Sequence, residues 1–161
     1  MGLFDFCKSG ENKSVELYNP VDGEVIPIEE VSDPVFSQKM MGDGFAIEPT
    51  DGKVVAPVDG EIAVAFPTGH AYGIVTKQGV EILLHLGIDT VELDGAGFEP
   101  QVKVGDKVKA GDTLALMDLE AIRAAGKPLT SMLIFTSGQT VNLLKEGQNV
   151  SVNDADLFEF Q

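Results

Sequence analysis

The ten residues Pro57-Val-Asp-Gly-Glu-Ile-Ala-Val-Ala-Phe66 join a tight turn to an alternating strand. Pro-x-Asp-Gly favours a turn, because proline fixes its own φ and glycine accepts a positive φ. From Glu61 to Phe66, the isoleucine, valine and phenylalanine share one face of an extended chain, and the two alanines share the other. The stretch therefore predicts a β-strand that begins directly after a turn.

The same pattern of turn and short strand recurs along the chain, which contains 18 glycines and eight prolines. Many short strands separated by turns are typical of an all-β sandwich or barrel. We predict such a fold, antiparallel, with one short helix at Leu119–Ala125 that is capped by Asp118 and ended by Gly126. The predicted strands are Val15–Tyr18, Glu24–Ile28, Phe45–Ile47, Val54–Ala56, Glu61–Phe66, Gly73–Thr76, Val80–Leu86, Thr113–Met117, Leu129–Phe135 and Val150–Val152.

Two segments of the chain are identical. Pro20–Glu24 and Pro57–Glu61 both read Pro-Val-Asp-Gly-Glu, and Val104-Gly-Asp-Lys107 is echoed by Ala110-Gly-Asp-Thr113. Two matches are too few for a solenoid. They favour a barrel-sandwich hybrid type of fold with two related halves, although repeated turn chemistry alone would give the same pattern.

Composition excludes several classes of protein. The 161 residues include 26 acidic and 11 basic side chains, for a formal net charge of -15, so the chain lacks the positive charge that nucleic-acid binding requires. A single cysteine, Cys7, cannot form an internal disulfide and fits a reducing compartment. No apolar run reaches the roughly 20 residues that span a bilayer. We predict a soluble, cytoplasmic protein with a tail at residues 1–13 and a single domain at residues 14–161.

The two histidines are the strongest candidates for chemistry, because the GxxxxGK[ST], GxGxxG, CxxC, HExxH and GxSxG motifs are all missing. On a strand from Val80 to Leu86, His85 points away from the core together with Leu83. His70 lies in a turn before the preceding strand, so a hairpin would bring both rings to one face. Two neighbouring histidines could bind a metal ion, act as an acid and a base, or act as a nucleophile and its helper. They could also be two ordinary surface histidines. A catalytic zinc takes three protein ligands, and the chain has no third histidine.

The segment Gly79-Val-Glu-Ile-Leu-Leu-His-Leu-Gly-Ile-Asp-Thr-Val91 resembles the phosphorylation-site signature of a known family. This is the glucose-family IIA component of the bacterial phosphoenolpyruvate:sugar phosphotransferase system. The resemblance runs from about Val15 to the C-terminus, and the MGLF start favours the free-standing form. Further landmarks of that family occur in the same order, at Asp33–Phe36, Lys39–Gly44, Val55–Gly60 and Thr68–Ala71.

The resemblance implies a role for each residue near the histidines. His85 would be the phosphohistidine, which accepts a phosphoryl group on Nε2 from phospho-HPr and passes it to a cysteine of the IIB domain of a sugar permease. His70 would stabilise the transferred group, Thr68 would orient His70, and the carbonyl of Gly87 would hold the Nδ1 proton of His85. No cofactor would be required, although relatives can share a zinc ion between both histidines and a carboxylate of a partner.

The resemblance also implies a shallow apolar partner surface around the histidines. Adaptable methionines suit a site that binds two partners in turn, and acidic residues at the rim would steer a basic partner. Each residue has a structural alternative as well: Phe66 and Val91 could belong to the core, and the two aspartates could be turn residues or solvated charges. The surface would comprise Asp33, Phe36, Met40, Met41, Phe66, Leu83, Asp89 and Val91.

The chain departs from the family pattern in two places. Gly69 stands where some relatives carry a polar side chain, and the amino-terminal segment has fewer basic residues than the membrane-touching tail of free-standing relatives. We therefore expect weak membrane contact or none.

Two other functions stay open. A regulatory binding module would not need the histidines, and regulatory proteins could bind a phosphocarrier too. A biotinyl- or lipoyl-carrier-like domain is the other alternative, because Val104–Asp112 resembles the turn pairs of such domains. Those carriers need a lysine at an exposed hairpin tip, whereas Lys39 follows Gln38 with no strand leading to it.

Overall fold

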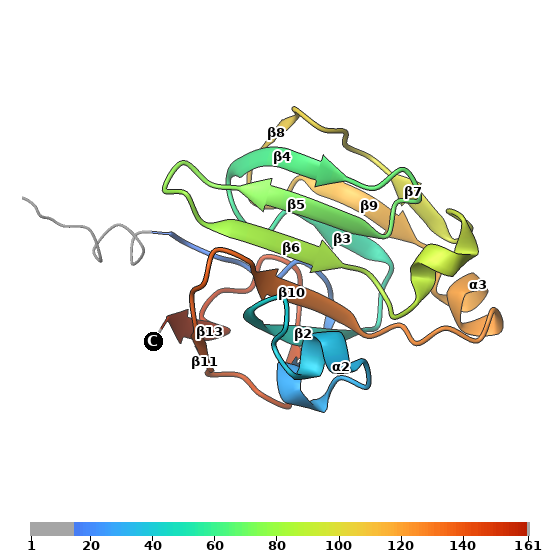
Figure 1. The fold of residues 1–161 in the computed structure, drawn as a ribbon, viewed down its shortest axis with the longest axis horizontal. Helices are drawn as coiled ribbons and strands as arrows, with labels where there is room; N and C mark the ends of the chain where they lie inside the picture. Colours follow the sequence, from blue (N-terminus) through green and yellow to red (C-terminus); the bar gives the residue numbers. More distant parts are fainter. Residues whose placement is uncertain (1–14, 161) are drawn as a thin grey trace, which may run out of the picture.

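The computed structural model describes residues 15–160 (Figure 1). The predicted tail at residues 1–13 and Cys7 lie outside this range. The strands are β1 (Gly23–Pro27), β2 (Asp43–Pro49), β3 (Lys53–Val55), β4 (Gly60–Ala65), β5 (Ala71–Val75), β6 (Glu81–His85), β7 (Phe98–Pro100), β8 (Lys107–Val108), β9 (Thr113–Met117), β10 (Ser131–Phe135), β11 (Val141–Leu143), β12 (Asn149–Val150) and β13 (Phe158–Phe160). The helices are α2 (Pro34–Ser37) and α3 (Leu119–Ala124), with 3-10 turns η1 (Ile28–Glu30) and η2 (Thr90–Leu93).

The strands form three antiparallel sheets. The largest has the order β12-β1-β2-β10-β6-β5-β4-β8, a second has the order β3-β9-β7, and β11 pairs with β13. In Figure 1 the β3-β9-β7 sheet lies behind β4, β5 and β6. The apolar faces of the strands enclose one main core, which includes Val25, Phe45, Ile62, Tyr72 and Leu114. The all-β sandwich predicted from the turn spacing is confirmed.

Some predicted elements differ from those observed. Val15–Tyr18 is not a strand, because it joins no ladder and makes only isolated backbone bonds such as Tyr18 N to Pro57 O at 2.9 Å. The helix at Leu119–Ala125 is present as α3, and the Asp118 carboxylate accepts a hydrogen bond from the N–H of Ala121 at 3.1 Å. The sequence pattern missed α2, β7, β8, β11 and β13, which have two to four residues each and are too short to show a period. No helix among residues 15–160 is long and apolar enough to cross a membrane.

Strand β6 has the two faces that its alternation predicts. Ile82 and Leu84 are buried, and so are Val80 and Leu86 just outside the strand. His85 lies on the opposite face, where it is partly exposed. The core face therefore anchors β6 by burying aliphatic side chains, each worth about 1.5–3 kcal/mol when fully buried. This anchoring fixes the position from which His85 projects.

A second, smaller core covers part of the other face of the sheet. Ile28 and Phe36, from η1 and α2, pack with Met132 and Ile134 of β10. Figure 1 shows α2 lying over β2 and β10. Helix α2 begins at Pro34, a favourable first helical residue, and the Asp33 carboxylate caps it by accepting a hydrogen bond from Val35 N at 2.9 Å. On this outer face of the sheet, η1 and α2 therefore cover the side chains of β10, whereas His85 on β6 stays partly exposed.

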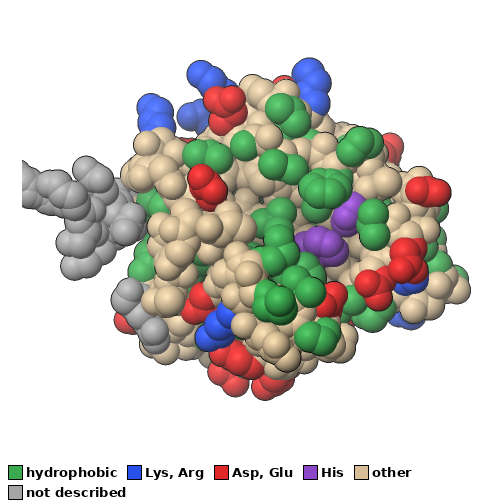
Figure 2. All heavy atoms as spheres, in the orientation of Figure 1, with side chains coloured by type: hydrophobic (Ala, Val, Ile, Leu, Met, Phe, Trp, Pro, Cys, Tyr) green, Lys and Arg blue, Asp and Glu red, His purple; other side chains and the backbone are tan. Residues whose placement is uncertain are grey.

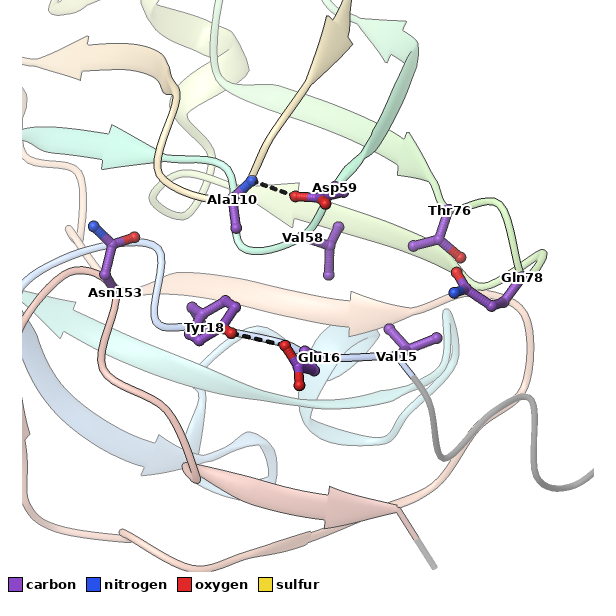
Figure 3. A pocket seen from close by; sticks show the side chains of 9 residues that line it. All are labelled: Val15, Glu16, Tyr18, Val58, Asp59, Thr76, Gln78, Ala110 and Asn153. Atoms are coloured by element: carbon purple, nitrogen blue, oxygen red, sulfur yellow. Dashed lines mark hydrogen bonds between the residues drawn. The ribbon is translucent and has the colours of Figure 1, made fainter.

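The repeated Pro-Val-Asp-Gly-Glu segments occupy equivalent places in the sheet. Each segment leads into a strand, β1 or β4, and the aspartate of each accepts a hydrogen bond from a turn that is distant in sequence. The Asp22 carboxylate accepts a hydrogen bond from Val152 N at 2.7 Å, and the Asp59 carboxylate accepts one from Ala110 N at 2.8 Å (Figure 3). The two segments also exchange backbone bonds reciprocally, since Tyr18 N donates to Pro57 O and Val55 N donates to Pro20 O. These contacts support the two related halves predicted from the repeat.

The large sheet is symmetric about its middle, because β12, β1, β2 and β10 of one half correspond to β8, β4, β5 and β6 of the other. Strand β1 lies between β12 and β2, and β4 lies between β8 and β5. The halves meet where β10 pairs with β6, with Leu133 opposite Leu84. On either side of that pair, Met132 faces His85 and Ile134 faces Leu83. By this register His85 corresponds to Ile134 of the other half, so only one half carries a histidine at this position.

Candidate functional site

The hairpin formed by β5 and β6 brings the two histidines together, as the sequence predicts. Ala71 lies opposite His85 in the ladder, and Leu86 N donates to the carbonyl of His70 at 2.7 Å. The ring centroids of His70 and His85 lie 5.2 Å apart, with their planes at 77°. Because each end of this contact is fixed by backbone hydrogen bonds, the pair is held by the sheet itself.

The His85 ring has its tautomer set by the backbone. Its Nδ1 lies 2.8 Å from the carbonyl oxygen of Gly87. A carbonyl oxygen can only accept, so the proton of the neutral ring must reside on Nδ1. The lone pair of Nε2 is consequently available to a nucleophilic or metal-binding reaction.

Gly87 can present its carbonyl to His85 because of its backbone conformation. Its φ is +79°, a left-handed value that favours glycine. A Cβ at this position would lie 2.5 Å from Cγ2 of Thr90 and 3.1 Å from the carbonyl oxygen of Pro128. Thr90 cannot easily move aside, because it is buried and its hydroxyl donates to the carbonyl of Leu86 at 2.6 Å.

Replacing Gly87 by alanine is expected to lower the free energy of unfolding by about 3 kcal/mol, the sum of backbone strain and overpacking. Gly79→Ala is the matched control, since Gly79 has a φ of +87° and a Cβ added there would meet no atom within 4 Å. It should cost only the backbone strain, about 1–2 kcal/mol. Urea unfolding measures both, and equal losses would contradict the clash with Thr90.

The His70 ring is buried, with 2% of its surface exposed. Its Nδ1 lies 2.6 Å from the hydroxyl of Thr68. If Thr68 donates this hydrogen bond, the ring proton resides on Nε2, which can then donate to a bound group. Gly69 between them has a φ of +76° and would bring a Cβ within 3.0 Å of Phe98 Cβ. The departure from the family pattern at Gly69 therefore coincides with a conformation that suits glycine.

Both histidines favour the neutral state. Burial lowers the pKa of His70, and the neighbouring His85 ring lowers it further. Burial also lowers the pKa of His85, although its hydrogen bond to Gly87 and the charges of Asp33 and Asp89 oppose the shift. A neutral imidazole keeps the Nε2 lone pair that a nucleophile requires.

These lowered pKa values make stability depend on pH. Between the folded pKa of each histidine and its unfolded value near 6.5, the unfolded chain binds more protons than the folded one. The free energy of unfolding should therefore fall as the pH drops below about 6.5, and level off once the folded rings are protonated. Urea titrations across this range should show a shallower fall for His70→Gln than for the unchanged chain. An identical slope for both proteins would contradict the lowered pKa of His70.

The predicted partner surface surrounds the histidines. Met40, Val91, Phe66 and Met41 are 70%, 49%, 43% and 41% exposed, so the alternative that Phe66 and Val91 belong to the core is wrong. Figure 2 shows hydrophobic side chains gathered around both histidines. Leu83 is half-buried beside them.

Two phenylalanines frame the imidazole pair. The Phe36 ring lies 5.0 Å from the His85 ring but is buried, so it packs against His85 instead of lying exposed on the partner surface as predicted. The Phe66 ring lies 5.1 Å from the His70 ring, edge to face. Sequence reasoning missed Val35 and Val64, which are 40% and 42% exposed on α2 and β4. The prediction that Ile62, Val64 and Phe66 share one face is wrong, because a bulge between Ile62 and Val64 leaves Ile62 in the core and Val64 exposed like Phe66.

The two aspartates of the predicted rim also have structural roles. Asp33 caps α2, and Asp89 adopts a left-handed conformation, φ +60°, at the start of η2. The negative charge of each raises the pKa of His85, which places both in its electrostatic field. The structural and functional alternatives for Asp33 and Asp89 are therefore compatible.

Lys39 does not suit a carrier lysine. It follows α2 in a left-handed turn, φ +60°, instead of the tip of a hairpin between strands. Its Nζ lies 3.0 Å from Glu29 and 3.5 Å from Asp43. These ion pairs hold the ammonium group beside the start of β2. A carrier lysine must instead be free to move its attached group between enzymes.

Among residues 15–160, no group of three or more His, Cys, Asp and Glu side chains is arranged to hold a metal ion. The two histidines could supply two nitrogen ligands through Nε2, because each Nδ1 already has a hydrogen-bond partner. A tetrahedral zinc ion would need further ligands from another molecule.

Comparisons with known proteins agree with one another. The family model for the phosphoenolpyruvate-dependent sugar phosphotransferase system, EIIA 1, matches residues 15–141. The glucose-specific EIIA component of Staphylococcus epidermidis is 48% identical over 140 residues, which span 86% of this chain and 84% of that protein. The glucose-specific EIICBA component of Streptococcus pneumoniae is 52% identical over 130 residues, which span 81% of this chain and 18% of that longer protein. The solved glucose permease IIA of Mycoplasma capricolum superimposes with a TM-score of 0.83 at 46% identity, over 89% of this chain and 94% of that one.

Proposed function

This chain belongs to the EIIA 1 family of the phosphoenolpyruvate-dependent sugar phosphotransferase system, and we propose that it carries a phosphoryl group on His85 between two protein partners. The donor is phospho-HPr, and the acceptor is a cysteine of the IIB domain of a glucose-type sugar permease. The phosphoryl group moves during coupled sugar uptake and phosphorylation. The chain acts in the cytoplasm, where both partners present their reactive groups.

The observation that carries this proposal is the hydrogen bond from His85 Nδ1 to the carbonyl of Gly87, 2.8 Å long. It directs the Nε2 lone pair toward the open face. In the first step this lone pair attacks the phosphorus atom of phospho-HPr, and the bond between phosphorus and the HPr nitrogen breaks. The electron pair of that bond returns to HPr, while the Nδ1 proton stays on His85.

In the second step a cysteine thiolate of the IIB domain attacks the same phosphorus atom. The bond to Nε2 breaks, and its electron pair restores the neutral His85 ring. His70 assists this second step by donating a hydrogen bond from Nε2 to a phosphoryl oxygen as negative charge accumulates there. Thr68 holds His70 in the tautomer that can donate, through the 2.6 Å contact with Nδ1.

The exposed apolar surface around the histidines docks both partners in turn. Its exposed methionines adapt to two different shapes, and Phe66, Leu83 and Val91 give it a largely apolar surface. The buried Phe36 packs against His85 instead of contributing exposed area. Asp33 and Asp89 attract basic residues of a partner. Transfer requires no cofactor; a zinc ion shared by His70, His85 and a partner's carboxylate would occupy both Nε2 atoms and so exclude the phosphoryl group.

Reconstitution of the relay tests this function. The chain is incubated with enzyme I, HPr and phosphoenolpyruvate, and its intact mass is followed before and after a glucose-type IIB domain is added. One acid-labile phosphoryl group should appear and should leave when IIB is added. A chain that gains no phosphoryl group, while a control IIA protein is labelled in parallel, would instead be a regulatory binding module.

A further inference from the structure

A cavity of about 730 Å³ lies at the opposite end of the β4–β5 hairpin from the histidines. The histidine site adjoins the end of β4 and the start of β5, whereas this cavity adjoins the start of β4, the end of β5 and the edge strand β8. Three lysines line it: Lys77, Lys107 and Lys109. In Figure 2 a group of basic side chains stands along the upper edge of the molecule, apart from the two histidines.

The concentration of lysines is unusual for this chain. Only 11 basic residues accompany 26 acidic ones, yet three of them line one cavity. Ammonium groups that converge on a concave site attract anions, and their N–H groups make charge-assisted hydrogen bonds to phosphate oxygens. The lining also holds the carboxylates of Asp59 and Glu61, so three lysines leave it one positive charge in excess. The local charge therefore favours an anionic ligand, although the molecule as a whole is acidic.

The two related halves of the sheet show that the fold does not require these lysines. Val108 pairs with Gly60 as Val150 pairs with Gly23, so Lys107 and Lys109 correspond to Asn149 and Ser151. Strand β12, at the opposite edge of the sheet from β8, is thus correctly paired without lysine. Protection of a sheet edge against aggregation does not by itself explain the lysines of β8.

The same correspondence applies to the third lysine. Val75 pairs with Glu61 as Glu48 pairs with Glu24, which makes Lys77 equivalent to Thr50. Each of the three lysines is therefore replaced by an uncharged side chain in the related half. A ligand that only one half binds accounts for this asymmetry.

The other lining residues suit a ligand whose ring carries polar groups and has one apolar face. Val75 and Ala63 contribute apolar surface, Gln78 contributes an amide, and Glu61 contributes a carboxylate. Asp59 is already engaged, since its carboxylate accepts the hydrogen bond from Ala110 N (Figure 3). A cavity of this size falls within the range of small-molecule sites.

We propose that this cavity binds a phosphorylated sugar, with the phosphate held by Lys77, Lys107 and Lys109 and the sugar ring against Val75 and Gln78. The choice of a sugar among phosphomonoesters rests on the proposed function, because a sugar phosphate is the product of the phosphotransferase system. The site lies apart from the histidines, so the chain can bind this product without blocking the docking of its protein partners.

Amide chemical shifts of the ¹⁵N-labelled chain test the proposal, with glucose 6-phosphate, glucose and inorganic phosphate as separate probes. No HPr or phosphoenolpyruvate is present, so the result does not depend on whether His85 accepts a phosphoryl group. Glucose 6-phosphate should shift the amides of residues 75–78 and 107–109 and leave that of His85 unchanged. Shifts confined to the histidines, no shifts at millimolar ligand, or equal affinity for inorganic phosphate would each overturn the proposal.

The related half supplies substitutions that the fold already accepts. The combined variant Lys77→Thr, Lys107→Asn, Lys109→Ser should lower the affinity for glucose 6-phosphate at least tenfold. The single variant Lys107→Asn is compared with Lys53→Asn, which removes an equal charge from an exposed residue of β3 outside the cavity. Only Lys107→Asn should weaken binding. Equal affinity of these two single variants would overturn the proposal, even if the combined variant failed to fold.

Discussion

The His85→Ala chain is expected to accept no phosphoryl group at all. The substitution removes the Nε2 nucleophile, and we do not expect His70 to replace it, because its ring is buried and its Nδ1 already contacts Thr68. Loss of a covalent nucleophile typically lowers the rate by many orders of magnitude. Intact mass after incubation with enzyme I, HPr and phosphoenolpyruvate measures the loss.

A structural control is needed, because the His85 ring also contacts the Phe36 ring at 5.0 Å. His85→Gln keeps much of the side-chain volume and should be equally inactive. Circular dichroism and urea unfolding should show that at least one of the two variants is folded. A folded variant that still gains an acid-labile phosphoryl group would place the phosphorylated residue elsewhere.

Replacing His70 by alanine should separate acceptance from delivery. The unpaired His85 Nε2 still attacks phospho-HPr, so the variant should acquire its phosphoryl group. Delivery to the IIB cysteine should slow by about 10²–10³, the loss that follows removal of one donor to a developing negative charge. Quenched-flow measurement of phosphoryl loss from the pre-labelled chain gives this rate directly.

Two further variants distinguish donation from packing. His70→Gln places an amide donor near the position of Nε2 and should recover part of the rate that His70→Ala loses. Thr68→Val retains the ring but removes its 2.6 Å contact with the hydroxyl, so it should slow delivery by a smaller factor. If His70→Ala delivered its phosphoryl group as fast as the unchanged chain, His70 would have no part in the transfer.

The local parts of this site could be predicted because their spacing along the chain is short. Period-two alternation in Val80–Leu86 assigns His85 to the open face, and the buried residues of β6 agree. The contacts of His85 with Gly87 and of His70 with Thr68 were implied by the resemblance to the family, and each joins residues only two positions apart. The meeting of the histidines followed from one hairpin between adjacent strands.

Other parts could not be predicted because they depend on tertiary contacts. Only the resemblance placed Phe36 near the histidines, because its contact with His85 joins segments far apart in sequence and forms once η1 and α2 fold over β10. Strands β8 and β12 have two residues each, and their positions depend on pairing alone. Val15–Tyr18 alternates like a strand but finds no partner strand among residues 15–160. The cavity at β8 gathers Lys77 with Lys107 and Lys109 across 30 residues of chain.

The two histidines lie on one surface, and this limits the rate at which the carrier can exchange its partners. In the proposed relay, donor and acceptor need the same His85 atom, so a complex of all three proteins cannot form, and each transfer must be followed by separation. A partner that stayed bound would prevent the next phosphoryl transfer. Turnover can then be no faster than dissociation, so both complexes must be short-lived, with affinity kept modest by fast release. Tighter docking through the apolar surface would lower the throughput of the whole system.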